Sequence, residues 1–137
     1  MDTSSFDYST AVVAHLTYFG IAIVATVLFV AIYVTVTPHR EFTLIRQGNI
    51  AAAISLGGAL LGYIIPLAKA VSQSQSVADM LLWSGVALVA QLVAYGISRL
   101  ILPTLSADVD TGKVASGIFM AAMSVSIGLL NAAAMTE

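Results

Sequence analysis

The stretch that decides the fold runs from Ala11 to Thr37, AVVAHLTYFGIAIVATVLFVAIYVTVT. It contains no aspartate, glutamate, lysine or arginine, and its one histidine is His15. At 27 residues it exceeds the length of about 20 that a helix needs to cross the hydrocarbon core of a bilayer. The chain before it is acidic and lacks the positive start of a signal peptide, so we expect this helix to remain in the mature protein.

The composition of the whole chain also indicates a membrane protein. Of its 137 residues, 59% are hydrophobic and 9% are charged, whereas soluble domains are close to half apolar and about a quarter charged. The formal net charge is -2 and the chain has no basic run, which argues against nucleic acid as a partner. The chain has no cysteine, so disulfides and thiolate metal sites are excluded.

Three further apolar stretches predict three more transmembrane helices. They run from Asn49 or Ile50 to about Lys69, from roughly Asp79 to Leu102, and from Val114 to Met135. Pro38 and Pro103 end the first and third helices, because proline cannot continue the helical hydrogen-bond pattern. Between residues 40 and 47 apolar and charged residues alternate, which predicts a short segment at the membrane interface. Residues 104–113 are expected to form a polar link.

Small residues divide the chain into two similar halves. They recur at steps of four, three and four residues on the second and fourth predicted helices, which places each set on one helix face. The two sets are Ala51, Ser55, Gly58 and Gly62, and Gly117, Ala121, Ser124 and Gly128. We therefore predict an all-α membrane protein of four transmembrane helices, arranged as two tandem two-helix repeats. Its parts are a polar tail at 1–10, the first repeat at 11–70, an outer link at 71–78 and the second repeat at 79–137.

These two small-residue sets are the candidate helix-packing face, because small side chains let helix backbones approach closely in a membrane. Gly58 and Gly62 also form a GxxxG motif. Such a motif is typical of helix dimers, but it is also found in ordinary packing within one bundle. The sequence leaves both interpretations open.

The positive charges predict which side of the membrane each link faces. Arg40, Arg46, Arg99 and Lys113 flank the first and third links, whereas Lys69 alone flanks the second. Positively charged residues beside short loops favour the cytoplasmic side. We therefore expect both termini to lie outside the cytoplasm.

Gln91, Tyr95 and Arg99 form the candidate polar site within the membrane. They follow one another at four-residue steps, which puts them along one side of the third predicted helix. Polar side chains in hydrocarbon need partners and often mark functional sites. The three residues could line a polar path or bind a lipid head group. Alternatively, Gln91 and Tyr95 hydrogen-bond neighbouring helices while Arg99 reaches the interface.

Arg40, Glu41 and Arg46 are the candidate cytoplasmic contact, because with His39 they form the densest group of charges in the chain. They could dock a partner or lipid head groups, or they could form a solvated turn with weak ion pairs. Asn49 is expected to cap the second transmembrane helix, because its side chain can accept a hydrogen bond from the first turn.

Several segments in both halves follow a pattern that is seen in a known family. In the first half they are Thr37-Pro38-His39-Arg40-Glu41, Leu44 to Ala53, Gly57 to Gly62, and Pro66-Leu67. In the second half they are Asp79, Trp83 and Gln91, and the run from Ser124 to Ala133. Together these segments resemble the YjfL-like family of small bacterial inner-membrane proteins, a domain of unknown function. The resemblance covers essentially the whole chain and implies two copies of a two-helix unit in the bacterial inner membrane.

The resemblance implies a setting without assigning an activity. Members of the family are often encoded beside ATP-grasp enzymes similar to glutathionylspermidine synthase and beside membrane-stress proteins. This implies a link to envelope stress or maintenance.

The chain offers few residues that could carry out a reaction. No carboxylate is expected at mid-membrane depth, and the two histidines lie at opposite ends of the first helix, so neither a carboxylate proton relay nor a three-ligand zinc site is predicted. We expect no enzyme, no cofactor and no metal. Our first hypothesis is a non-catalytic membrane component that associates with copies of itself or with another membrane protein.

Two alternatives remain open. One is a small channel or transporter with a polar path near Gln91, Tyr95 and Arg99. The other, with less support, is a lipid or stress sensor that uses residues 40–46.

Overall fold

The computed structural model describes residues 7–38 and 40–135. Within these residues the regular structure is all helical, and four helices are long and apolar enough to cross a membrane. They are α1 (Tyr8–Val36), α3 (Ile50–Gln73), α4 (Val77–Ile101) and α6 (Val114–Ala134). Two helices of six residues, α2 (Glu41–Arg46) and α5 (Leu105–Asp110), join α1 to α3 and α4 to α6. The predicted all-α class with four candidate spans is confirmed.

Two links differ from the prediction. The predicted outer link at 71–78 is mostly helical, because only residues 74–76 separate α3 from α4. Ser76 caps α4 by accepting a hydrogen bond from the backbone N–H of Asp79 (3.1 Å). The predicted polar link at 104–113 contains the helix α5, whose residues Leu105 and Val109 are four apart and fully buried against the bundle.

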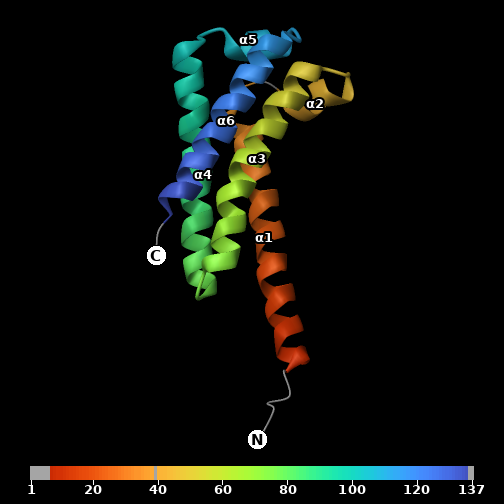
Figure 1. Cartoon of the computed structure of the whole chain (residues 1–137). Helices are drawn as coiled ribbons and strands as arrows, with labels where there is room; N and C mark the ends of the chain where they lie inside the picture. Colours follow the sequence, from red (N-terminus) through yellow and green to blue (C-terminus); the bar gives the residue numbers. More distant parts are fainter. Residues whose placement is uncertain (1–6, 39, 136–137) are drawn as a thin grey trace, which may run out of the picture.

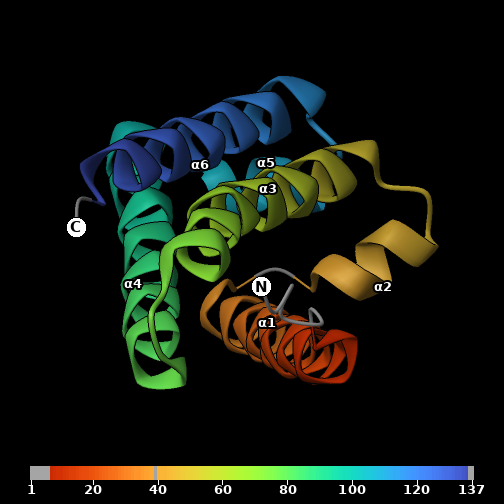
Figure 2. The same cartoon turned by 60° about the horizontal axis from the view of Figure 1, so that its bottom comes forward.

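Helices α3 and α6 form the centre of the bundle. They run side by side in the same direction, starting from the end of the molecule that carries α2 and α5 (Figure 1). Helix α4 packs against both of them. Helix α1 packs against α3 and α4, so that α3 lies between α1 and α6 (Figure 2).

Each short helix is followed, two residues after its last residue, by a glycine that turns the chain into the next long helix. Gly48 and Gly112 have φ angles of +83° and +80°, which glycine adopts without strain. Asn49 then starts α3, since its Oδ1 accepts a hydrogen bond from the backbone N–H of Ala52 (2.9 Å), as predicted. Its Nδ2 donates to the carbonyl oxygen of Val109 (2.7 Å), which ties the start of α3 to α5.

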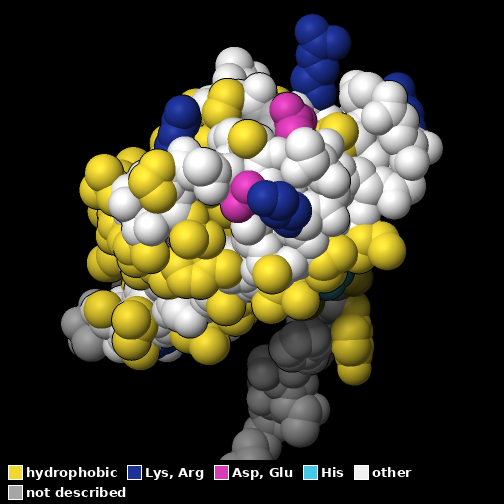
Figure 3. All heavy atoms as spheres, turned by 90° about the horizontal axis from the view of Figure 1, so that it is seen from above, with side chains coloured by type: hydrophobic (Ala, Val, Ile, Leu, Met, Phe, Trp, Pro, Cys, Tyr) yellow, Lys and Arg dark blue, Asp and Glu magenta, His cyan; other side chains and the backbone are white. Residues whose placement is uncertain are grey.

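Charged side chains gather at the end formed by α2 and α5. Arg40, Arg46, Arg99 and Lys113 are all exposed there, and Figure 3 shows lysine and arginine side chains on this face, together with acidic side chains and much backbone. Large hydrophobic side chains cover the outer sides of α1 and α4 instead. This division matches a bundle whose sides face lipid and whose end faces water.

Candidate functional site

The two predicted small-residue faces meet each other inside the chain. The pairs in contact are Ala51 with Gly117, Gly58 with Ala121, and Gly62 with both Ser124 and Gly128. A Cβ atom added to Gly62 would clash with the carbonyl oxygen of Ser124, and one added to Gly128 would clash with the backbone of Gly62. The helices can approach this closely only because no side chain stands between them. In this structure, the GxxxG motif packs two helices of one chain.

Gln91 joins α4 to this central pair. Its side chain is fully buried, and its Nε2 donates a hydrogen bond to the carbonyl oxygen of Ser124 (3.1 Å). A Cβ atom on Gly62 would lie 2.6 Å from the same Nε2. Glycine at position 62 therefore makes room both for the backbone of α6 and for the amide of Gln91.

Several buried polar atoms of α3, α4 and α6 lack hydrogen-bond partners among the described residues. They include the Oε1 atom of Gln91 and the hydroxyls of Ser55 and Ser124. These three side chains are at most 1% exposed. Buried polar atoms without partners are uncommon in folded proteins, so these three are exceptions within the membrane-embedded core.

The structure brings Tyr95 into the interior with Gln91 but leaves Arg99 outside. The Tyr95 hydroxyl lies 3.1 Å from the Oγ of Ser106 on α5, and its ring is buried. Arg99 is exposed at the end of α4, and Ser98 takes the interior position. Eight residues turn a helix by about 80° beyond two full turns, so Arg99 has rotated away from the face of Gln91.

The residues of the candidate cytoplasmic contact are also divided between the surface and the interior. Arg40 and Arg46 are exposed, but the side chain of Glu41 is only 1% exposed, so its predicted place in a surface contact is wrong. Glu41 is the first residue of α2 and its side chain is buried in the bundle, where its Oε1 accepts a hydrogen bond from the Thr37 hydroxyl (2.7 Å). His39 lies outside the described residues.

A buried face that the sequence analysis missed continues from α1 into α2. Phe29, Tyr33, Thr37 and Glu41 are all buried, and they follow one another at four-residue steps. The ring of Phe29 stacks on that of Tyr63 in α3, with centroids 4.2 Å apart. The regular spacing was the available signal, but it extends across the helix end at Pro38 and was therefore overlooked.

Asp108 fastens α5 to the start of α6. Its carboxylate accepts a hydrogen bond from the Ser116 hydroxyl (2.8 Å) and lies 3.3 Å from the Nζ of Lys113. The hydrogen bond from Ser116, with further help from Lys113 and Thr104, holds the pKa of Asp108 below its ordinary value of 3.8. A carboxyl of this kind stabilises the fold above that ordinary pKa, and its contribution is lost as the pH falls through the lower, folded value.

We therefore expect acidification from about pH 6 to about pH 3 to lower the unfolding temperature of the native chain more than that of Asp108→Asn. Asparagine at position 108 has no charge to lose in this range, and the other carboxyl groups are the same in both proteins. Thermal unfolding in mild detergent, followed by circular dichroism at each pH, measures the difference. Parallel pH profiles for the two proteins would show that Asp108 contributes nothing.

Comparison with known proteins places the chain in a family. Residues 7–135 match the family described as Domain of Unknown Function (DUF350). The chain belongs to the DUF350 family. It is 40% identical to the UPF0719 inner membrane protein YjfL of Escherichia coli (strain K12) over an alignment of 119 residues, which covers 87% of this chain and 90% of that protein. It is 27% identical to the UPF0719 transmembrane protein YshE of Bacillus subtilis (strain 168) over 112 residues, which cover 82% of this chain and 84% of that protein.

Membership in the DUF350 family confirms the resemblance found in the sequence. Together with four candidate spans, it confirms a multi-pass protein of the inner membrane, surrounded by the lipid bilayer. No solved structure matches the chain. The description of the family assigns no role, so a role has to be argued from the geometry of this chain.

Proposed function

We propose that this DUF350 protein is a non-catalytic membrane component that associates with copies of itself or with another membrane protein. The observation that carries the proposal is the packing around Gln91. A polar path past this residue would need space that the backbones of Gly62 and Ser124 occupy. The enclosed junction therefore supports a packed scaffold rather than a channel within one chain. A link to envelope stress or maintenance is part of the same proposal and rests on the family resemblance alone.

The proposal includes two tandem repeats, α1 to α3 and α4 to α6. Each half consists of a long helix, a six-residue helix, a glycine with positive φ and a second long helix. Ala51 contacts Gly117, Gly62 contacts Gly128, and both pairs have the same separation along the chain. Contacts between corresponding positions are what a two-fold axis between similar halves produces. The symmetry of these contacts supports a duplication.

The proposal also places both termini outside the cytoplasm. Arg40, Arg46 and Arg99 are exposed at the end with α2 and α5. At the opposite end, the Nζ of Lys69 donates to the carbonyl oxygen of Ala132 (2.6 Å), near the end of α6. Lys69 keeps its charge in that contact, but it is one cation against the three arginines and Lys113 at the other end, so the end with α2 and α5 is the more positive of the two.

Self-association then needs a surface other than the GxxxG motif, which is already used within the chain. The outer face of α4 offers one. A Cβ atom on Gly85 or Gly96 would meet nothing within 4 Å. Hollows of about 520 Å³ and 430 Å³ lie over these two glycines. Glycines that face outward in a membrane let a neighbouring helix approach closely.

We expect the double variant Gly85→Leu, Gly96→Leu to lose self-association, because leucine fills both hollows. Single-particle mass measurement in lipid nanodiscs gives the number of chains per particle. Ala122→Leu, at an exposed site on α6, is the matched control and should keep the native number. A native protein that is monomeric in bilayers and captures no membrane partner would refute the proposed function. A double variant with an unchanged oligomer would refute only the choice of surface.

A further inference from the structure

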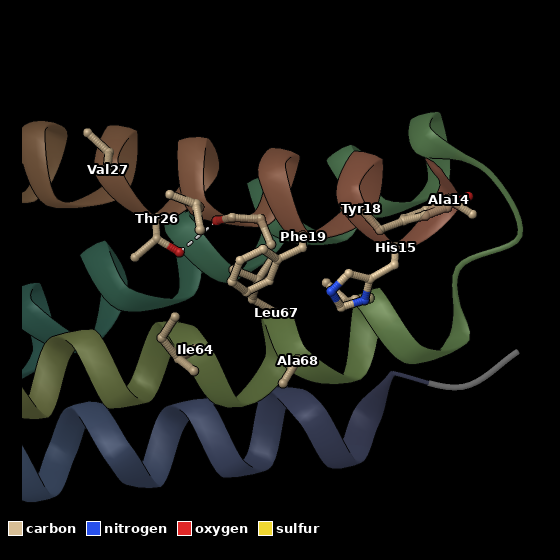
Figure 4. A pocket seen from close by; sticks show the side chains of 12 residues that line it. Ala14, His15, Tyr18, Phe19, Thr26, Val27, Ile64, Leu67 and Ala68 are labelled. Atoms are coloured by element: carbon tan, nitrogen blue, oxygen red, sulfur yellow. Dashed lines mark hydrogen bonds between the residues drawn. The ribbon is translucent and has the colours of Figure 1, made fainter. Parts of the chain in front are cut away.

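A hollow opens between α1 and α3, in the half of the bundle away from α2 and α5. Its volume is about 680 Å³, and its walls are α1 from Ala14 to Val27 and α3 from Ile64 to Val71. Figure 4 shows the side chains of the two helices on either side of it. We call it the α1–α3 groove.

The polar side chains of the α1–α3 groove are unevenly distributed. His15 and Tyr18 lie toward one end, and the imidazole of His15 is stacked on the ring of Phe19 with centroids 5.7 Å apart. Toward the other end the Thr26 hydroxyl donates to the carbonyl oxygen of Ala22 (2.8 Å), so it is already used within α1. The groove therefore has one polar end and an apolar remainder.

The position of α1 places the α1–α3 groove in a single leaflet of the bilayer. Counting about 20 residues back from Val36, enough to cross the hydrocarbon core, reaches Thr17. His15 then lies at the level of the lipid head groups, and Tyr18 lies at the border of the hydrocarbon core. Val27 lies nine residues from Val36, about 14 Å along the helix and close to the midplane. The groove thus extends over the depth of one acyl chain.

The lining of the groove decides between the possible occupants. Apart from Thr26, whose hydroxyl is used within α1, its polar side chains are His15 and Tyr18 at one end, and the remainder is apolar. A phospholipid has the same division between its head group and its acyl chains. An acyl chain is a single file of methylene groups and can enter.

We propose that the α1–α3 groove is a binding site for one phospholipid, with an acyl chain between the helices and the phosphate at His15. An imidazole N–H can donate a hydrogen bond to a phosphate oxygen. The side chain of His15 is exposed at the polar end, where this phosphate would lie. A lipid held between two helices would stay bound longer than one on the open outer face of α4. This site is independent of the proposed self-association.

The test uses a substitution that fills the groove and leaves the buried core residues unchanged. Ala68 is an exposed alanine that lines the groove, and Ala122 is an exposed alanine on α6 outside it. The native protein, Ala68→Phe and Ala122→Phe are reconstituted into vesicles of phosphatidylethanolamine and phosphatidylglycerol and released into mild detergent. Native mass spectrometry then counts the phospholipids that remain bound. We expect one retained phospholipid per chain in the native protein and in Ala122→Phe, and loss of it in Ala68→Phe.

A second measurement does not depend on any variant. Vesicles that contain a phospholipid with a photoactivatable acyl chain are irradiated with the native protein, and the labelled residues are mapped. We expect labelling concentrated on the residues that line the groove, and weaker labelling of the outer face of α4. Uniform labelling of all outer faces, equal retention by the two phenylalanine variants, or no retention by the native protein would overturn the proposal.

Discussion

Gly62→Ala is expected to destabilise the protein by about 3 kcal/mol, although it adds a single methyl group. The added Cβ would clash with the carbonyl oxygen of Ser124 and lie 2.6 Å from the Nε2 of Gln91. Backbone atoms of α6 cannot rotate away as a flexible side chain could. The two central helices must therefore separate, and the hydrogen bond from Gln91 to α6 is weakened with them.

Gly57→Ala is the matched control on the same helix. A Cβ atom at Gly57 would meet nothing within 4 Å, so this variant should be as stable as the native protein or slightly more stable, because alanine favours the helix. Unfolding by titration with sodium dodecyl sulfate in mixed micelles gives the midpoint for each protein. Gly58→Ala, which would clash with Ala121, should behave like Gly62→Ala. Equal midpoints for all the variants would contradict the close packing of α3 and α6.

The helix-packing face could be predicted from the sequence, because the spacing that marks it lies within a single helix. Ala51, Gly58 and Gly62 share a face through the 3.6-residue helical repeat, and no knowledge of the rest of the fold is needed to see it. The four spans followed equally directly from the length of each apolar stretch. The identity of the facing helix did not follow, because GxxxG has the same appearance whether its partner lies in the same chain or another.

The candidate polar and charged sites were harder to predict, because their positions depend on rotations that accumulate along the chain. The four-residue steps predict Arg99 on the side of Gln91, yet the rotation of about 80° beyond two full turns carries it from the interior to the surface. Glu41 was expected at the surface because it stands among charges. Its burial depends on the direction in which α2 leaves the end of α1, and the four-residue spacing from Phe29 to Glu41 crosses that helix end, where a helical repeat no longer predicts a position. In α5, only Leu105 and Val109 mark a buried face, and a segment of six residues is too short to show a period.

Helix α1 is attached to the bundle mainly at one end. Its buried residues are Phe29 and Tyr33, both in the part near α2. Nearer its start, the α1–α3 groove lies on one side and a hollow of about 360 Å³ beside α4 lies on the other. Lipid is as apolar as the side chains of α1, so the hydrophobic effect does not press this helix against its neighbours. Direct packing must hold it, through the aromatic rings near α2 and, more weakly, through Tyr18 and Ile21 against the cluster that contains Ala70.

Phe29→Ala is therefore expected to free the first part of α1 and to cost about 3 kcal/mol, near the low end for loss of a buried phenylalanine. The stack with Tyr63 is lost, and the helix keeps its connection through α2. Because the chain has no native cysteine, spin labels on Thr17→Cys and Ser72→Cys can report the distance between α1 and α3 by double electron–electron resonance. We expect a broader and longer distance distribution than in the parent protein.

Phe19→Ala is the control for this prediction, since it removes the same ring from a position that is 55% exposed. It should leave the distance distribution unchanged. An unchanged distribution in Phe29→Ala would show that the link through α2 holds α1 without the aromatic stack.

If α1 does move, the α1–α3 groove loses one of its walls. Phe29→Ala should then also reduce phospholipid retention, although Phe29 does not line the groove. Loss of retention together with a broadened distance would connect the attachment of α1 to the lipid site by a single cause.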